Sequence, residues 1–150
     1  MQAICQKILN ANPDYKILYV SCDAFMNQFF ECVRSVQMSE LHQRYRHVDM
    51  LVIDDIHFLA DKDRSQEEFF HTYNALYQHN TQIVLSSDAA PNEIPKLEER
   101  LVSRFNWGLV AQVGKPCFET RIAILKATAQ LRSVEVPDEV IELIASRVDT

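Results

Sequence analysis

Leu51-Val52-Ile53-Asp54-Asp55 is a short apolar run that ends in two adjacent carboxylates. Apolar residues in a row, without polar alternation, are typical of a strand buried on both faces of a parallel sheet. Open α/β sheets bind their ligands at the carboxyl ends of the strands. A carboxylate there can hold Mg²⁺ while its neighbour orients or deprotonates a water. We interpret the run as a Walker-B-type strand; the alternative is that the acids stop the strand and begin a solvated turn.

Composition limits the classes of protein and of partner. The chain has 150 residues, of which 47% are hydrophobic, so it has the length of one ordinary domain with a sizeable core. Its 15 Lys and Arg face 21 Asp and Glu, a formal charge of −6. Bulk charge therefore gives no tight, non-specific binding to nucleic acid, and any DNA contact must be local. No apolar run approaches the roughly 20 residues of a membrane span, and no signal peptide is visible.

Four cysteines indicate the compartment. They form no C-x-x-C pair and no metal-ligand spacing, and each lies in a predominantly apolar stretch: Cys5, Cys22, Cys32 and Cys117. This pattern predicts buried free thiols in a reducing compartment, with the cytoplasm as the expected location.

Glycine is scarce, and its positions are informative. Gly108 and Gly114 are the two glycines of the chain, so the pattern G-x-x-x-x-G-K-[ST] cannot be written anywhere in it. Gly114-Lys115-Pro116 is no substitute, because it lacks the first glycine and the hydroxyl that would meet Mg²⁺. These 150 residues therefore contain no P-loop.

Hydrophobic periodicity and turn residues predict an alternation of strands and helices. Strands are expected at 16–20, 51–55, 82–85 and 109–113. Helices are expected at 2–9, 24–36, 40–45, 65–78, 97–103, 119–131 and 138–148. Asp23 is the expected N-cap of the second helix, and Ser65-x-x-Glu68 is expected to form a capping box at the start of the helix over 65–78. We expect Trp107 to lie in the core.

Further polar residues are expected beside the acidic pair. Asp88 follows the strand at 82–85, so it should lie next to Asp54 and Asp55 at the same sheet edge. Arg100 and Arg104 lie on the next helix and could stabilise phosphate charge. The alternatives are an Asx turn at Asp88 and a solvated ion-pair face at the arginines, which neighbour two glutamates.

A second group of residues has the chemistry of a nucleic-acid contact. Lys62 and Arg64 are cations in a loop that could contact backbone phosphates, and an exposed Phe30 could contact sugar or base. The alternative is ordinary surface charge. The five histidines are scattered, and we assign no metal ligand among them. A receiver domain would need the acidic pair near its first strand, and a hydrolase of the G-x-S-x-G type is not indicated because that motif is absent.

Four stretches together closely resemble the AAA+ domain of DnaA, the bacterial replication initiator family, and the likeness covers essentially the whole chain. They are Val52-Ile53-Asp54-Asp55-Ile56, Arg64 through Leu76, Leu85-Ser86-Ser87-Asp88, and Arg100 through Leu109. The resemblance implies an α/β fold with the three-layer parallel sheet of AAA+ P-loop NTPases, here without its first strand and P-loop. It also implies that 1–150 is a partial AAA+ core, with Walker B at 51–55, sensor I near 88 and box VII at 97–104.

The resemblance further implies a role for each matching residue. Asp54 would coordinate Mg²⁺, Asp55 would position the hydrolytic water, and Asp88 would be the sensor I residue. Arg104 would be the arginine finger that reaches the ATP of a neighbouring subunit, with Arg100 supporting assembly. ATP or ADP with Mg²⁺ would be the cofactors, and the family's slow ATPase activity acts as a timing switch. We expect this chain alone to be inactive, because it has no P-loop.

Partners follow from the same resemblance. The helix pair at about 23–45 is similar to the initiator-specific insertion that shapes the family's filament, and Phe30, Lys62 and Arg64 match residues lining its single-stranded DNA channel. Origin DNA, single-stranded DNA and further copies of the chain are therefore the expected partners, with the replicative helicase or regulators as additional candidates. His57 stands where glutamine is common in the family.

Several features depart from the family. The P-loop would precede Met1, while the lid helices and the duplex-binding domain would follow Thr150, so the chain has the appearance of a piece of a longer protein. A frayed native terminus would look the same. Without the central strand that the family has, we expect this chain to be poorly stable or to self-associate. Two alternative interpretations remain: a regulator or helicase loader of the same fold, such as an Hda-like protein, or an inert truncated fragment.

Overall fold

The computed structural model describes residues 1–148, which form two compact units. The first unit is Met1–Leu109, and the second begins at Val110. Each unit is described by itself below.

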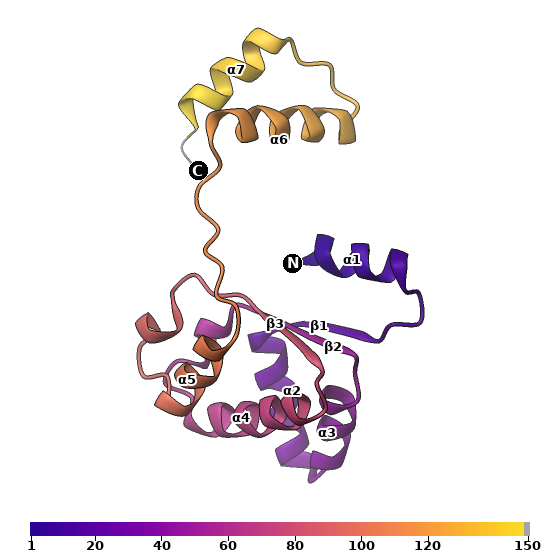
Figure 1. The fold of residues 1–150 in the computed structure, drawn as a ribbon, viewed down its shortest axis with the longest axis vertical. Helices are drawn as coiled ribbons and strands as arrows, with labels where there is room; N and C mark the ends of the chain where they lie inside the picture. Colours follow the sequence, from indigo (N-terminus) through magenta and orange to yellow (C-terminus); the bar gives the residue numbers. More distant parts are fainter. Residues whose placement is uncertain (149–150) are drawn as a thin grey trace. The chain divides into compact units, whose positions relative to one another are not determined.

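A three-stranded parallel sheet is the framework of the first unit (Figure 1). Its order is β1 (Ile17–Ser21), β2 (Met50–Asp54) and β3 (Gln82–Leu85), and in register Val20 pairs with Ile53, which pairs with Leu85. The four apolar residues of β2 before Asp54 are all buried. The expected parallel α/β sheet is confirmed, with the acidic run as its central strand.

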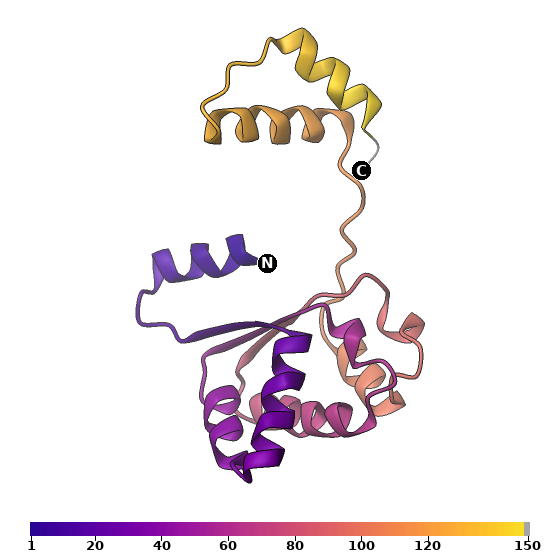
Figure 2. The same ribbon diagram turned by 180° about the vertical axis from the view of Figure 1, so that it is seen from behind.

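Helices cover the sheet. They are α1 (Gln2–Ala11), α2 (Cys22–Ser35), α3 (Met38–Arg46), α4 (Asp63–Gln78) and α5 (Glu99–Trp107), with short 3₁₀ helices η1 (Ile56–Leu59) and η2 (Pro91–Glu93). Figures 1 and 2 show α2 to α5 on one side of the sheet and α1 on the other. The core lies between the sheet and α2, α3 and α4, where Phe25 makes edge-to-face contacts with Tyr45 and Phe69 at centroid distances of 5.1 and 5.6 Å.

Two predicted helix caps are wrong. Ser21 caps α2, since its Oγ accepts a hydrogen bond from the Ala24 backbone N–H at 3.2 Å, and Asp23 lies inside the helix. Helix α4 begins at Asp63, two residues before the predicted start, so Ser65 lies within its first turn and forms no capping box. Packing explains the position of Ser65. Its side chain is 0% exposed, whereas a solvated capping residue would be accessible.

Three further expectations fail at the carboxyl end of the first unit and beyond. Trp107 is 71% exposed and not in the core. Residues 109–113 form no strand, because a strand needs a paired neighbour and none of the described residues pairs with them. The cysteines are free, but Cys117 is exposed and only Cys22 is fully buried.

The second unit is a pair of helices, α6 (Phe118–Leu131) and α7 (Asp138–Arg147). Arg121 joins them: its Nε donates to the Ala145 carbonyl at 2.8 Å, and its Nη1 donates to the Pro116 carbonyl at 3.1 Å. None of the helices in the described residues combines the length and apolar character that a membrane crossing requires.

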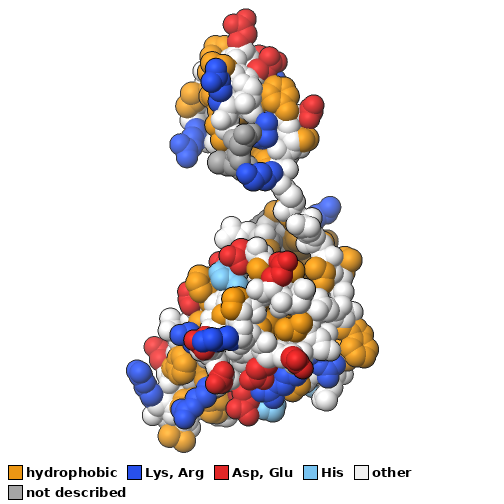
Figure 3. Space-filling model, turned by 90° about the vertical axis from the view of Figure 1, so that its left-hand side faces the viewer, with side chains coloured by type: hydrophobic (Ala, Val, Ile, Leu, Met, Phe, Trp, Pro, Cys, Tyr) orange, Lys and Arg blue, Asp and Glu red, His pale blue; other side chains and the backbone are white. Residues whose placement is uncertain are grey.

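Charge is mixed on one face of the first unit. On the face drawn in Figure 3, basic and acidic side chains of the larger unit lie side by side and do not separate into patches of one sign. An anion that binds on this face would therefore need a local site.

Candidate functional site

Asp54 ends the central strand, and two hydroxyl groups hold its carboxylate. The Ser86 hydroxyl donates to Asp54 Oδ1, and the Tyr19 hydroxyl donates to Asp54 Oδ2. These hydrogen bonds, from Ser86 first and Tyr19 second, lower the pKa of Asp54 below its ordinary value. The same bond to Asp54 raises the pKa of Tyr19. The carboxylate is therefore ionised at neutral pH and fixed in orientation.

Asp55 lies in the left-handed region of backbone conformation, with φ 62° and ψ 50°. Aspartate adopts this conformation more readily than most residues. Its backbone N–H donates to Ser86 Oγ at 3.0 Å, and the next N–H, of Ile56, donates to the Ser86 carbonyl at 2.9 Å. Ser86 thereby fixes the turn after the central strand and leaves the Asp55 side chain exposed at the sheet edge.

Asp88 lies beside His57 and has no described contact with the acidic pair. His57 Nδ1 is 3.0 Å from Asp88 Oδ1, and that nitrogen makes no well-directed hydrogen bond among the described residues. The prediction placed Asp88 next to Asp54 and Asp55, but Ser86, two residues earlier, makes that contact. The reason is geometric, since β3 ends at Leu85 and the first residue after a strand lies nearest to the neighbouring strand's end.

Arg100 and Arg104 lie on α5 and stack on aromatic rings of α4. The Arg100 guanidinium carbon is 4.6 Å from the centre of the Phe70 ring, and Arg100 Nε forms an ion pair with Glu98. Arg104 lies 5.8 Å from the Tyr77 ring centre and 5.9 Å from that of Trp107. No described contact joins either arginine to Asp54 or Asp55. The described contacts of these arginines are thus with the aromatic rings and Glu98, and not with the acidic pair.

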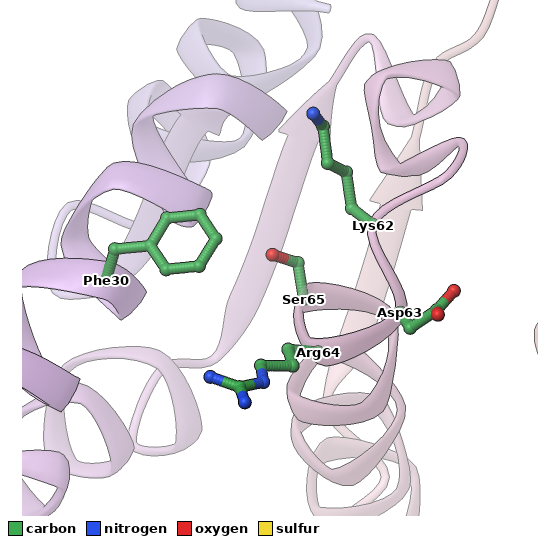
Figure 4. A pocket seen from close by; sticks show the side chains of 5 residues that line it. All are labelled: Phe30, Lys62, Asp63, Arg64 and Ser65. Atoms are coloured by element: carbon green, nitrogen blue, oxygen red, sulfur yellow. The ribbon is translucent and has the colours of Figure 1, made fainter.

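Phe30, Lys62 and Arg64 line one pocket, as their predicted common role requires. It has a volume of about 270 Å³, and Asp63 and Ser65 complete its lining. Figure 4 shows the Phe30 ring, the Lys62 and Arg64 side chains and the Ser65 hydroxyl around one space, while the Asp63 carboxylate points away. Phe30 is 40% exposed although its neighbour Phe29 is buried. Helix α2 thus presents an aromatic ring to the start of α4.

The floor of this pocket has unsatisfied hydrogen-bond donors. Lys62 is the N-cap residue of α4, and no side chain caps this helix. The first N–H groups of a helix have no partner within it, and they carry the positive end of the helix dipole. The Ser65 hydroxyl is buried and has no hydrogen-bond partner. Two cations, a helix N-terminus and a free hydroxyl form a site that suits a phosphate group.

The acidic site has the chemistry of a magnesium ligand. Each carboxylate oxygen of Asp54 accepts one hydrogen bond and keeps another lone pair, so the group can still bind a cation. Mg²⁺ in proteins is commonly held by one or two carboxylates together with substrate phosphates. Within the described residues, no group of three or more His, Cys, Asp or Glu side chains could hold a metal ion by itself. Asp54 fits Mg²⁺ that arrives with a nucleotide.

Sequence reasoning missed the residues that support these sites. Tyr19 and Ser86 orient Asp54 from the two neighbouring strands, and only the strand register brings them to it. The sequence pattern predicts Ser65 as part of a capping box, whereas its position directly after Arg64 is the local signal for the pocket. Gln66 is buried and makes three hydrogen bonds to two other segments, and nothing in the local pattern indicates this.

Comparison with known sequences identifies the family. The model of the bacterial DnaA ATPase domain matches residues 1–112. The chain is 49% identical over all its 150 residues to the chromosomal replication initiator protein DnaA of Levilactobacillus brevis, and 48% identical to that of Caldanaerobacter subterraneus subsp. tengcongensis. It covers 33% and 34% of these two proteins, so it spans about a third of their length.

Solved structures agree with this result. Domain III of the Thermotoga maritima replication initiation protein DnaA matches with a TM-score of 0.94 and 36% identity, over 99% of this chain and 62% of that one. A replication initiator DnaA bound to AMPPCP and single-stranded DNA matches with a TM-score of 0.84 and 33% identity, over 93% of this chain and 44% of that one. Sequence and fold lead to one conclusion: the chain belongs to the bacterial DnaA ATPase domain family.

Proposed function

We propose that this chain is the part of a DnaA-type initiator that contacts single-stranded DNA and supplies the acidic half of an ATP site. The parent initiator would bind ATP in the cytoplasm, assemble at the replication origin and open duplex DNA by engaging single strands. The pocket between α2 and α4 carries this proposal, because it brings an exposed aromatic ring, two cations and a buried hydroxyl without a partner around one space. A relative that matches over 93% of this chain was solved with single-stranded DNA and AMPPCP, which supports it.

The pocket suits the backbone of a single strand. A phosphate at the N-terminus of α4 would accept hydrogen bonds from the Ser65 hydroxyl and the free backbone N–H groups, and Lys62 and Arg64 would neutralise its charge. The exposed Phe30 ring offers a face on which a sugar or base can stack. Since the net charge is −6, these contacts must act locally and not through a broad positive field.

The sheet edge suits the phosphates of ATP with Mg²⁺. Bound Mg²⁺ would neutralise charge that develops on the transferred phosphoryl group. Asp54, held by Tyr19 and Ser86, would be its ligand from this chain. Asp55 would orient the attacking water from its exposed position, and Asp88, whose Oδ1 lies 3.0 Å from His57 Nδ1, would sense the terminal phosphate. These residues have no P-loop among them, so we expect this chain alone to have no ATPase activity.

The arginines of α5 suit a contact with another copy. The Arg104 guanidinium carbon lies 5.8 Å from the Tyr77 ring centre and 5.9 Å from that of Trp107, and these contacts would restrain it before a partner arrives and so reduce the entropy lost on binding. We propose that Arg104 acts as an arginine finger on the nucleotide of a neighbouring subunit, and that Arg100 supports the same assembly. The partner of this face would be a second copy of the chain in a nucleotide-dependent homo-oligomer.

The helix pair α2–α3 favours an initiator over a related regulator. A regulator or helicase loader of the Hda-like type would lack this insertion, whereas here α2 supplies Phe30 to the pocket and α3 packs beside it against α4. The pair would be the initiator-specific element. Its contribution to the DNA pocket is a testable difference between the two functions.

Fluorescence anisotropy with a labelled oligodeoxythymidylate tests the proposal. Lys62→Ala and Arg64→Ala should each weaken binding and lower the slope of log K against log salt by about 0.7, the value for one phosphate contact to a single strand. Phe30→Ala should weaken binding with little change in that slope, because stacking is not ionic. Lys7→Ala, an exposed charge on α1, is the matched control and should leave both quantities unchanged. Equal effects of Lys62→Ala and Lys7→Ala would refute the pocket's role.

A further inference from the structure

Gln66 is a polar side chain in the interior that joins three segments. It is 0% exposed, and a buried amide is costly unless its polar atoms are bonded. Its Nε2 donates to the Leu59 carbonyl and to the Lys96 carbonyl, each at 3.0 Å. Its Oε1 accepts from the Glu98 backbone N–H at 2.8 Å. Both amide hydrogens and one carbonyl lone pair are thus used between α4 and two other segments.

The partners of Gln66 lie at the end of η1, which follows the acidic pair, and at the start of α5, which carries the two arginines. Leu59 is the last residue of η1, which follows Asp55 directly. Glu98 is the N-cap residue of α5, and Lys96 precedes it in the left-handed region with φ 54°. A lysine in that conformation costs about 1 kcal/mol or more and persists where its surroundings hold it. Gln66 therefore fixes the start of α5 against α4 and η1.

One end of this connection is the DNA pocket. Arg64 and Ser65 line the pocket, and Gln66 is the next residue on the same first turn of α4. A phosphate bound at that turn would stabilise its helical conformation, because it satisfies the free N–H groups. The backbone of Gln66 belongs to this turn, since its N–H donates to the Lys62 carbonyl at 2.9 Å.

The other end is the arginine helix. The Glu98 backbone is bonded to Gln66, and its carboxylate forms the ion pair with Arg100 Nε. Arg104 lies one helical turn beyond Arg100. A continuous series of contacts thus runs from the pocket through Gln66 and Glu98 to the arginines, and contiguous networks of this kind can carry energetic coupling between sites.

We propose that Gln66 is a positioning residue that couples occupancy of the DNA pocket to the order of the α5 arginines. The inference rests on the proposed function of the pocket. Single-stranded DNA bound at the start of α4 would stabilise the first helical turn of α4. Gln66 would then keep its three hydrogen bonds, and these bonds would fix the start of α5. Single-stranded DNA and the subunit-facing arginines would therefore reinforce each other.

Gln66→Met and Thr72→Val are the variants for the test. Methionine keeps the unbranched stem and a similar volume, so it removes the three hydrogen bonds with little change in packing. Thr72 is also 0% exposed and lies on the same helix, but its hydroxyl donates to Glu68 at 3.3 Å and has no described contact with α5. It controls for the general effect of losing a buried polar group in α4.

Amide hydrogen exchange is measured on the 150-residue chain with and without oligodeoxythymidylate, while anisotropy of the labelled oligonucleotide confirms binding. In the wild type and in Thr72→Val, we expect binding to slow exchange at residues 98–104 of α5. In Gln66→Met, we expect binding to persist and this added protection to be lost. Protection that is retained in Gln66→Met would overturn the coupling.

The wild-type arm is decisive even if Gln66→Met does not fold. Bound oligonucleotide without added protection at residues 98–104 would overturn the inference and leave the proposed function intact. Absence of binding in the anisotropy measurement would overturn the proposed function of the pocket, and the coupling with it. The two failures are therefore distinguishable. Trp107, the one tryptophan of the chain, gives a second readout of α5 through its fluorescence.

Discussion

The Ser86 hydroxyl donates a hydrogen bond to the Asp54 carboxylate and joins the ends of two neighbouring strands. The same Ser86 oxygen accepts the Asp55 backbone N–H at 3.0 Å. One side chain therefore sets both the orientation of the proposed magnesium ligand and the turn that exposes the second acid. Through Ser86, the pairing of β2 with β3 determines how the two acidic side chains are placed.

Ser86→Ala should raise the pKa of Asp54 toward its ordinary value, because it removes the largest cause of the lowered pKa. A carboxyl group with a lowered pKa in the folded state stabilises the fold above its unfolded pKa of about 3.9, and this contribution is lost as the pH falls through the lower folded pKa. The variant should therefore be less stable than the wild type above about pH 4, and the difference between the two should shrink as the pH falls below that value. NMR titration of the Asp54 carboxyl carbon measures the shift directly.

Ser87→Ala is the control for that titration, since Ser87 is exposed and its Oγ accepts only the Ala89 backbone N–H at 3.3 Å. It should leave the Asp54 pKa unchanged. An Asp54 titration that is the same in Ser86→Ala and in the wild type would show that the hydroxyl does not hold the carboxylate.

Phe25 and Phe30 lie on the same helix and should respond differently to truncation. Phe25→Ala should lower the free energy of unfolding by about 3–5 kcal/mol, because it removes a fully buried ring from the core. Phe30→Ala should cost clearly less, about 1 kcal/mol, because its ring is 40% exposed and its aromatic contact is with Phe29 at a centroid distance of 5.4 Å. Urea unfolding followed by circular dichroism measures both. A large loss of stability in Phe30→Ala would make Phe30 a core residue and remove its assignment to the pocket.

Glu68 connects α3 and α4 through polar contacts of its carboxylate. Its Oε1 accepts from Arg46 Nη2 at 2.9 Å and Thr72 Oγ1 at 3.3 Å, and His42 Nε2 lies 3.2 Å away. Glu68→Gln keeps the shape but leaves the largely buried Arg46 guanidinium without its charge partner. We expect a loss of about 1–3 kcal/mol in the free energy of unfolding, the usual cost of an unsatisfied buried group. Glu67→Gln, the exposed neighbour, should have almost no effect, and equal effects of the two would contradict this role.

The sequence predicted what depends on local pattern and on strand order. The apolar run before Asp54 indicates a central parallel strand, which is confirmed. The common role of Phe30, Lys62 and Arg64 is implied by the family resemblance, and the three residues line one pocket. The sequence-based prediction is wrong where tertiary packing overrides a local pattern. Ser65 fits a capping box in sequence, yet burial makes it an interior residue of α4.

Other differences have the same origin. Trp107 has the composition of a core residue, but it lies at the end of α5 and stacks on Arg104 at the surface. The expected strand at 109–113 needs a paired neighbour, which the described residues do not provide. The contacts of Ser86 and Gln66 arise from strand register and helix packing, so no window of sequence contains them.

Chemical shift perturbation of the ¹⁵N-labelled chain by oligodeoxythymidylate tests the central claim most directly. If single-stranded DNA binds at the uncapped start of α4, the largest shifts should occur at the backbone amides of Asp63, Arg64 and Ser65, with further shifts around Phe30 on α2. Saturating oligonucleotide that leaves these amides unchanged, or that shifts only residues of α6 and α7, would contradict the account.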